Sequence, residues 1–276
     1  MKRLLTTTMM VILTLTLCSC GRNTTTPSTT TSSAIYPTSK TTTTTATHTQ
    51  PSTSTSTTSA IITPTESNIH SRLYIPGVSV EDVIAWFNEI VLNAEVVISG
   101  DATLVQKWVS PISYRIIGET TEQDRQVLKN FTDQLNTIPG FPGIHEVTEP
   151  WQSNMNIYFC PQSEFSTHVS DGFENTDGAI TFWYNDANQI YDAIICYRTD
   201  LDQYVRNSVL LEEIYNGLGP IQDTSSRSDS IIFSGYSTPQ TLTQEDWLLL
   251  ELLYHPDIVC GMTADQCERI IRTLYY

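Results

Sequence analysis

The stretch VLLEEIYNGLG, residues 209–219, decides how this chain is expected to fold. It lies in a predicted helix over residues 202–218, which a Gly-Pro pair ends. Because positions four apart share a helix face, Glu212 and Asn216 point the same way, and Gln222 can return toward them from the next loop. The helix is therefore expected to present one carboxylate and two amides to a common site.

Two further segments follow in a fixed order. SIIF at residues 230–233 predicts a turn, and LTQEDWLLLELLY at residues 242–254 predicts a helix that is apolar nearly all round and therefore buried. The three segments together resemble the zinc-protease core of the metzincins. In that superfamily the helix carries His-Glu-x-x-His-x-x-Gly-x-x-His, a Met-containing turn follows, and a further helix comes next.

The alignment with the metzincin motif needs no gap. Its Glu falls on Glu213 and its Gly on Gly219, which places the three zinc-binding His positions on Glu212, Asn216 and Gln222. Ile232 stands where metzincins carry the turn Met. The same block is also similar to an uncharacterised bacterial family, domain of unknown function 2927, which shows a similarly His-less version of the helix.

The chemistry of these side chains predicts a metzincin-like site that lacks the catalytic zinc ion. Zinc prefers imidazole, thiolate and carboxylate, and neutral amides bind it poorly. Glu213 is a remnant of a general base, because without a metal-bound water it has little to activate. We therefore expect no zinc and a non-catalytic cleft that binds an extended peptide or a neighbouring envelope protein. An active metal-dependent peptidase with non-standard ligands and a purely structural lipoprotein are the alternatives.

Periodicity predicts the other elements of an α+β domain over residues 68–276. The metzincin resemblance implies a small mixed sheet, a backing helix, the remnant active-site helix and C-terminal helices. Helices are expected at 79–94, 121–135, 202–218, 243–254 and 263–274, and strands at 108–117, 155–160, 179–184 and 190–197.

The N-terminal 67 residues predict export and anchoring. Residues 1–19 have a basic start and a short apolar core, as in a secretory signal. The sequence LCSC at 17–20 resembles a bacterial lipobox, which makes Cys20 the expected lipidation site. Residues 20–67 are rich in Thr, Ser and Pro, a composition typical of a disordered stalk. The chain is thus expected at the cell membrane, lipid-anchored, with its domain outside the cytoplasm.

The charge of the domain argues against anionic partners. Four of the 14 basic and one of the 30 acidic residues precede residue 68, which leaves 10 against 29, a net charge of −19. Such an acidic domain is not expected to bind nucleic acid or to dock directly on anionic lipid.

The domain has four cysteines, an even number that suggests disulfides in an exported protein. Cys260 and Cys267 flank a helix start and are the first candidate pair, and Cys160 with Cys196, each at the end of a strand-like run, is the second. Free buried thiols are the alternative, whereas the absence of CxxC spacing argues against a metal site.

One acidic turn is a candidate binding site for calcium as a cofactor. Asp171, Glu174, Asn175 and Asp177 precede the strand at 179–184, although their spacing does not fit an EF-hand and Asp-Gly is a common turn. His145, His168 and His255 share no ligand spacing and are interpreted as surface or core-edge residues.

Overall fold

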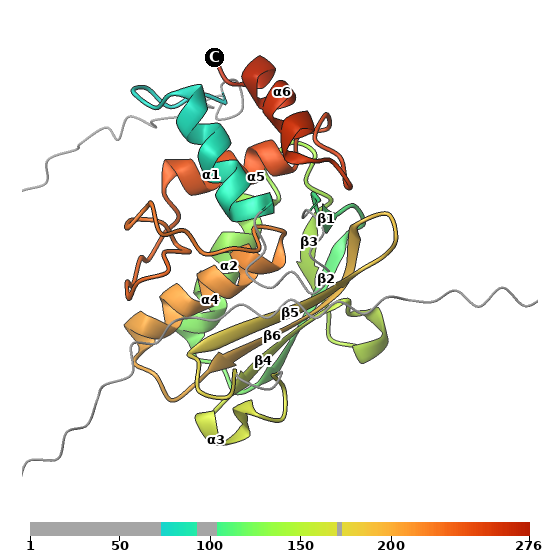
Figure 1. Ribbon diagram of the computed structural model, residues 1–276. Helices are drawn as coiled ribbons and strands as arrows, with labels where there is room; N and C mark the ends of the chain where they lie inside the picture. The colour runs from blue at the N-terminus through green and yellow to red at the C-terminus, as the bar shows by residue number, and fades with distance from the viewer. Residues whose placement is uncertain (1–72, 93–103, 170–172) are drawn as a thin grey trace, which may run out of the picture. The chain divides into compact units, whose positions relative to one another are not determined.

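The computed structural model describes residues 73–92, 104–169 and 173–276, and these form a mixed sheet with several helices (Figure 1). The predicted α+β class is confirmed. The elements in chain order are α1 (Val80–Leu92), β1 (Lys107–Trp108), β2 (Ile112–Gly118), α2 (Glu122–Leu135), β3 (Ile144–Glu146), the 3-10 helix η1 (Pro150–Gln152), β4 (Met155–Cys160), α3 (Gln162–Phe165), β5 (Gly178–Tyr184), β6 (Gln189–Arg198), α4 (Gln203–Gly217), α5 (Gln244–Leu253) and α6 (Ala264–Leu274).

The sheet has the strand order β1-β6-β4-β2-β3, and all of these neighbours are parallel. β5 is different, because it pairs antiparallel with β6 through a hairpin. Asn188 in that hairpin adopts a left-handed φ of 59°, which asparagine tolerates better than most residues. In the described part of the chain β5 pairs with β6 alone, so its other edge has no strand neighbour.

Helices α2 and α4 lie together against the sheet, and α4 contacts both β5 and β6. Helix α1 packs against α5 and α6 beyond them (Figure 1). The helix-facing side of the strands carries fully buried side chains, among them Ile157, Phe182 and Ile195. The opposite side has a smaller apolar cluster in which Phe165 of α3 covers Cys160 and Cys196.

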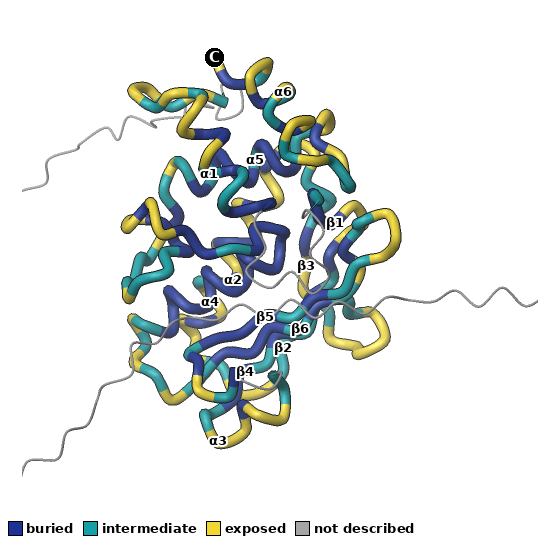
Figure 2. The backbone as a smooth tube through the Cα atoms, viewed as in Figure 1, coloured by how far each residue is buried: buried dark blue, intermediate teal, exposed yellow. Residues whose placement is uncertain are grey.

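Helix α4 is buried along most of its length, from Arg206 to Gly217, as Figure 2 shows by its dark blue tube. It ends at Gly217 with Leu218 as its C-cap, and Gly219 follows with a φ of +126°. A Cβ at Gly219 would lie 2.5 Å from the backbone oxygen of Gln106, so only glycine fits there. The helix end predicted from the Gly-Pro pair is confirmed.

The long predicted elements are all present, with one division. The strand expected at 108–117 is split into β1 and β2 around Pro111, because proline cannot donate to a ladder. β3, η1 and α3 were not predicted, since three or four residues carry no periodic pattern. No helix in the ranges that the structure describes is long and apolar enough to cross a bilayer.

Candidate functional site

The face of α4 that meets the sheet is built around glycines. A Cβ at Gly178, the first residue of β5, would lie 2.4 Å from Oε1 of Glu213 and 2.6 Å from Cγ1 of Val209. One turn further along α4, a Cβ at Gly217 would lie 3.2 Å from the side chain of Ile180. These glycines let α4 lie close to β5, and the close approach places Glu213 directly against the backbone of the strand.

The residues of α4 that align with the metzincin motif are buried inside the protein. The exposed fractions are 7% for Glu212, 2% for Glu213 and 2% for Asn216. Oε2 of Glu213 and Oδ1 of Asn216 are buried acceptors with no hydrogen-bond partner among the described residues. Buried polar atoms normally have a hydrogen-bond partner, so burying these two oxygens without one lowers the stability of the folded protein.

Burial also changes the protonation of the two glutamates. It raises the pKa of Glu213 well above the usual 4.5, and the nearby carboxylate of Asp223 adds to the rise. For Glu212 the rise has the same first cause, followed by repulsion from Glu213 and Asp223. None of the ion pairs found among the described residues neutralises either glutamate. The site therefore favours the protonated, neutral acids, and a protonated carboxyl cannot accept the proton that a general base takes up.

The three positions that align with zinc ligands do not form a zinc site. Glu212 and Asn216 are buried on α4, whereas Gln222 is half-buried in the next loop, where its backbone N–H donates to Ile90 of α1 at 3.1 Å. The donors are one carboxyl with a raised pKa and two amides, a set that does not fit zinc. Within the described residues, no group of three or more His, Cys, Asp or Glu could hold a metal ion.

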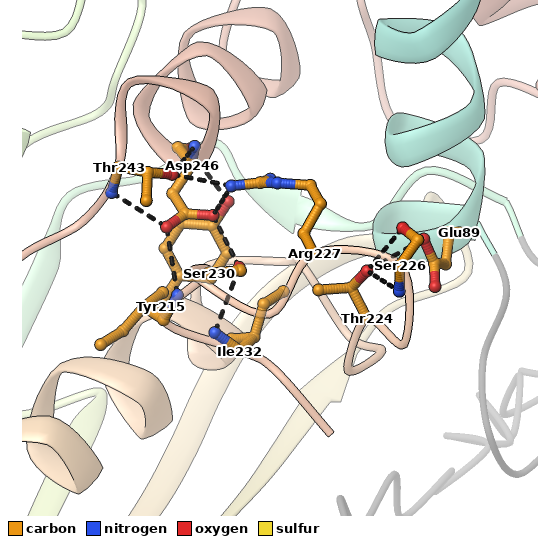
Figure 3. Close-up of polar contacts among 10 residues, drawn as sticks. Glu89, Tyr215, Thr224, Ser226, Arg227, Ser230, Ile232, Thr243 and Asp246 are labelled. Atoms are coloured by element: carbon orange, nitrogen blue, oxygen red, sulfur yellow. Dashed lines mark hydrogen bonds and ion pairs between the residues drawn. The ribbon is translucent and has the colours of Figure 1, made fainter. Parts of the chain in front are cut away.

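The turn at 230–233 is held by a buried carboxylate that the sequence analysis did not single out (Figure 3). Asp246 of α5 accepts hydrogen bonds from Ser230 Oγ at 2.7 Å and from the backbone N–H of Ile231 at 3.1 Å. Ile232 is fully buried. The Tyr215 hydroxyl donates to the backbone oxygen of Asp246 at 2.9 Å, so α4, the turn and α5 are fastened to one another.

Asp246 also carries an ion pair and a helix cap. Its Oδ1 lies 2.7 Å from the guanidinium of Arg227, and the two side chains are 0% and 5% exposed. It forms a capping box with Thr243 at the start of α5. The Thr-x-x-Asp spacing was visible in the sequence, but only the fold shows that the same carboxylate reaches the turn.

A sequence profile of a family described as protein of unknown function, DUF2927, matches residues 81–273. This chain belongs to that family. The match extends far beyond the block at 209–256 that carried the resemblance, from the first turn of α1 to the last turn of α6. No curated protein matches the chain in sequence.

The DUF2927 region contains a second buried carboxylate of the same kind. Asp124, at the capping box of α2, accepts hydrogen bonds from the Tyr197 hydroxyl at 2.7 Å and the Gln203 amide at 2.7 Å, and it pairs with Arg206. Burial opposes ionisation, yet the hydrogen bonds from Thr121, Gln203 and Tyr197 and the charge of Arg206 keep the pKa of Asp124 lowered. It joins α2, β6 and the start of α4.

A third carboxylate connects α1 to the loop after α4. Glu89 accepts hydrogen bonds from Thr224 Oγ1 at 3.0 Å, Ser225 N–H at 3.0 Å and Ser226 Oγ at 2.8 Å (Figure 3). These bonds hold the loop that contains Gln222 and Asp223 against α1. The sequence carried no signal for this contact, because its partners are separated by more than a hundred residues.

The remaining predicted site residues are dispersed. The four domain cysteines are free thiols in the structure, so neither bridge is formed in it, and the bridges stay a prediction for the oxidised protein. At the acidic turn, Asp171 lies outside the described residues, whereas Asp177 pairs with Arg198 at 3.0 Å. That ion pair gives Asp177 a structural role without calcium.

The histidines do not meet one another. His145 is on β3, His168 stacks on Tyr158 with ring centroids 4.3 Å apart, and His255 follows α5. None of them contributes to a metal-binding group in the described ranges. Cys20, the signal segment and the stalk all lie outside the residues that the structure describes.

Proposed function

We propose that this protein is a membrane-anchored bacterial lipoprotein whose metzincin-like domain is non-catalytic and binds an extended segment of a peptide or envelope protein. The lipid on Cys20 and the stalk at 20–67 display the domain outside the cytoplasm. The observation that carries the proposal is the position of Glu213, which is 2% exposed and packed against Gly178 of β5.

Buried Glu213 does not meet the requirements of a general base in peptide hydrolysis. A general base must lie within hydrogen-bond reach of a water or substrate and must be ionised. Here burial and Asp223 favour the protonated form of Glu213, and the aligned ligand positions hold amides at Asn216 and Gln222. The metzincin-like arrangement is supported by the order of the parts: a mixed sheet, the remnant helix α4, the turn with buried Ile232, and then helix α5.

The edge of β5 supports the binding of an extended chain. β5 is a seven-residue strand, and among the described residues its only strand partner is β6. An unpaired strand edge offers backbone N–H and C=O groups that a peptide can join as a further strand. The half-buried side chains of Thr181 and Trp183 lie two positions apart on the same face of β5 and supply contacts that distinguish one peptide from another.

The absence of catalysis is tested on the mature chain purified from zinc-supplemented medium. Metal content is measured by mass spectrometry, and cleavage of a peptide library is measured with and without chelator. The proposal expects sub-stoichiometric zinc and no chelator-sensitive cleavage. Stoichiometric zinc together with cleavage that Glu213→Gln abolishes would establish the peptidase instead.

Peptide binding is tested by selecting decapeptides from a displayed random library and mapping the bound complex by hydrogen exchange. The proposal expects new protection of amides within Gly178–Tyr184, and an affinity reduced about tenfold or more by Trp183→Ala. Trp151→Ala is the matched control, because Trp151 is 79% exposed and lies in η1, between β3 and β4, neither of which pairs with β5. Failure to select any binder, or protection confined to other elements, would favour a purely structural lipoprotein.

A further inference from the structure

A groove of about 540 Å³ lies where β1 meets the start of β6 and the segment that joins α5 to α6. Its lining is largely apolar, and its accessible apolar side chains are Val109, which follows β1, and Val259 of the joining segment, 46% and 49% exposed. Lys107 and Gln189 supply its polar side chains. None of these residues belongs to the remnant set on α4, so the inference does not depend on the proposed function.

Lys107 is the cation of this groove, and it is only 7% exposed. Its Nζ donates to the backbone oxygens of Leu253 at 2.7 Å and Ile258 at 2.5 Å, and it lies 5.6 Å from the centre of the Tyr254 ring. An ammonium has three N–H donors, so these two bonds leave one for another acceptor. Carbonyl dipoles hold the group in place but do not neutralise its charge.

Among the described residues, the buried arginines of the domain, unlike Lys107, each form an ion pair. Arg206 pairs with Asp124, and Arg227 pairs with Asp246, each of them with a fully buried carboxylate. In the residues that the structure describes, Lys107 forms no ion pair, although acidic side chains outnumber basic ones in this domain. A buried charge without a counter-charge is costly, and burial accordingly lowers the pKa of Lys107 to about 8.

We infer that this groove binds a small carboxylate with an apolar body, whose anionic end lies at Lys107 and whose body lies along Val109 and Val259. The ligand supplies the counter-charge that the described residues do not, and the walls bury its apolar part. Two sources share this chemistry, a free carboxylic acid and the C-terminal carboxylate of an apolar peptide. The volume accommodates either a small organic acid or the last residues of a peptide.

The test uses the mature chain and four probes in isothermal calorimetry and ligand-observed NMR. The probes are 4-phenylbutyrate and its neutral amide, and the tripeptide Ala-Leu-Phe with a free or an amidated C-terminus. Val259 is 49% exposed, so Val259→Glu places a competing carboxylate at the groove without disturbing the core, and Val259→Gln is the neutral control of equal size. Tyr236→Glu adds the same net charge at a 79% exposed side chain outside the groove.

The inference expects at least one carboxylate probe to bind, with its amide about tenfold weaker or worse. Val259→Glu is expected to reduce carboxylate binding about tenfold, whereas Val259→Gln and Tyr236→Glu leave it within about twofold. Binding of 4-phenylbutyrate alone identifies the free acid as the source, and binding of the tripeptide acid identifies the peptide terminus. No binding of either carboxylate overturns the inference, as does equal binding of acid and amide or equal loss in Val259→Glu and Val259→Gln.

Discussion

Replacing Glu213 by glutamine should flatten the pH dependence of folding stability. The folded protein raises the pKa of Glu213 well above its usual 4.5 because the carboxyl is buried and Asp223 is near. Between the unfolded and the folded pKa, the native state binds a proton that the unfolded state has released. Stability from this group is therefore fully present below the unfolded value and is lost as the pH rises toward the folded one.

The expected magnitude follows from this proton. One extra proton in the native state gives a slope of about −1.4 kcal/mol of unfolding free energy per pH unit, from about pH 4.5 upward to the folded pKa. Glu212, whose pKa is raised by the same burial and by Glu213 itself, adds a comparable slope. Wild type should therefore lose stability steeply as the pH rises through this window, and Glu213→Gln should lose it at about half the rate or less.

The measurement is urea unfolding of the mature chain at half-unit steps from pH 4.5 to 8. The comparison is of slopes, because a buried glutamine amide has its own unmet hydrogen bonds and the absolute stability shifts for that reason too. Glu149→Gln, at an exposed position, is the matched control and should leave the slope unchanged. Parallel profiles for wild type and Glu213→Gln would refute the reasoning, since they would mean that Glu213 titrates alike in both states.

Three other predictions concern stability and anchoring. Asp246→Asn should destabilise the domain by about 3–5 kcal/mol in urea unfolding, because it removes the counter-charge of a buried guanidinium and replaces one of the two acceptor oxygens by an N–H donor. Asp133→Asn, at an exposed pair with Lys129, should cost less than about 0.5 kcal/mol, and equal losses would contradict the assignment. Cys20→Ala should move the protein from the membrane fraction to the soluble fraction, and retention in the membrane would end the lipidation hypothesis. In exported protein, non-reducing peptide mapping should find a Cys260–Cys267 bridge worth about 2–3 kcal/mol, whereas free thiols at both positions would exclude it.

Much of the candidate site followed from local spacing. Glu212 and Asn216 share a helix because the pattern from 202 to 218 is helical and Gly219 stops it, and the structure has this helix as α4. The burial of Glu213 could not be predicted in this way. It arises because Gly178, distant in sequence, removes the side chain that would otherwise keep α4 away from β5.

For the buried aspartates too, the sequence could predict the local contacts but not the distant partners. Asp124 and Asp246 could be recognised as capping-box residues from the threonine three positions earlier. Their partners Arg206 and Arg227 could not, because the local spacing at a helix start does not show which residue from elsewhere in the chain lies beside the carboxylate. The burial of Lys107 could likewise not be predicted from the sequence, since nothing in the local pattern distinguishes a buried lysine from an exposed one.

The sequence by itself determined the elements and the chemistry available to them. Periodicity, caps and stop residues are local, so they located α4 and α5 and showed that amides occupy two of the aligned ligand positions. Only the tertiary structure decided which groups are buried, which are neutral and which are paired. Desolvation and ion pairing depend on neighbours brought together across the whole domain, and for that reason the raised pKa of Glu213 and the lowered pKa of Lys107 could be recognised only in the folded protein.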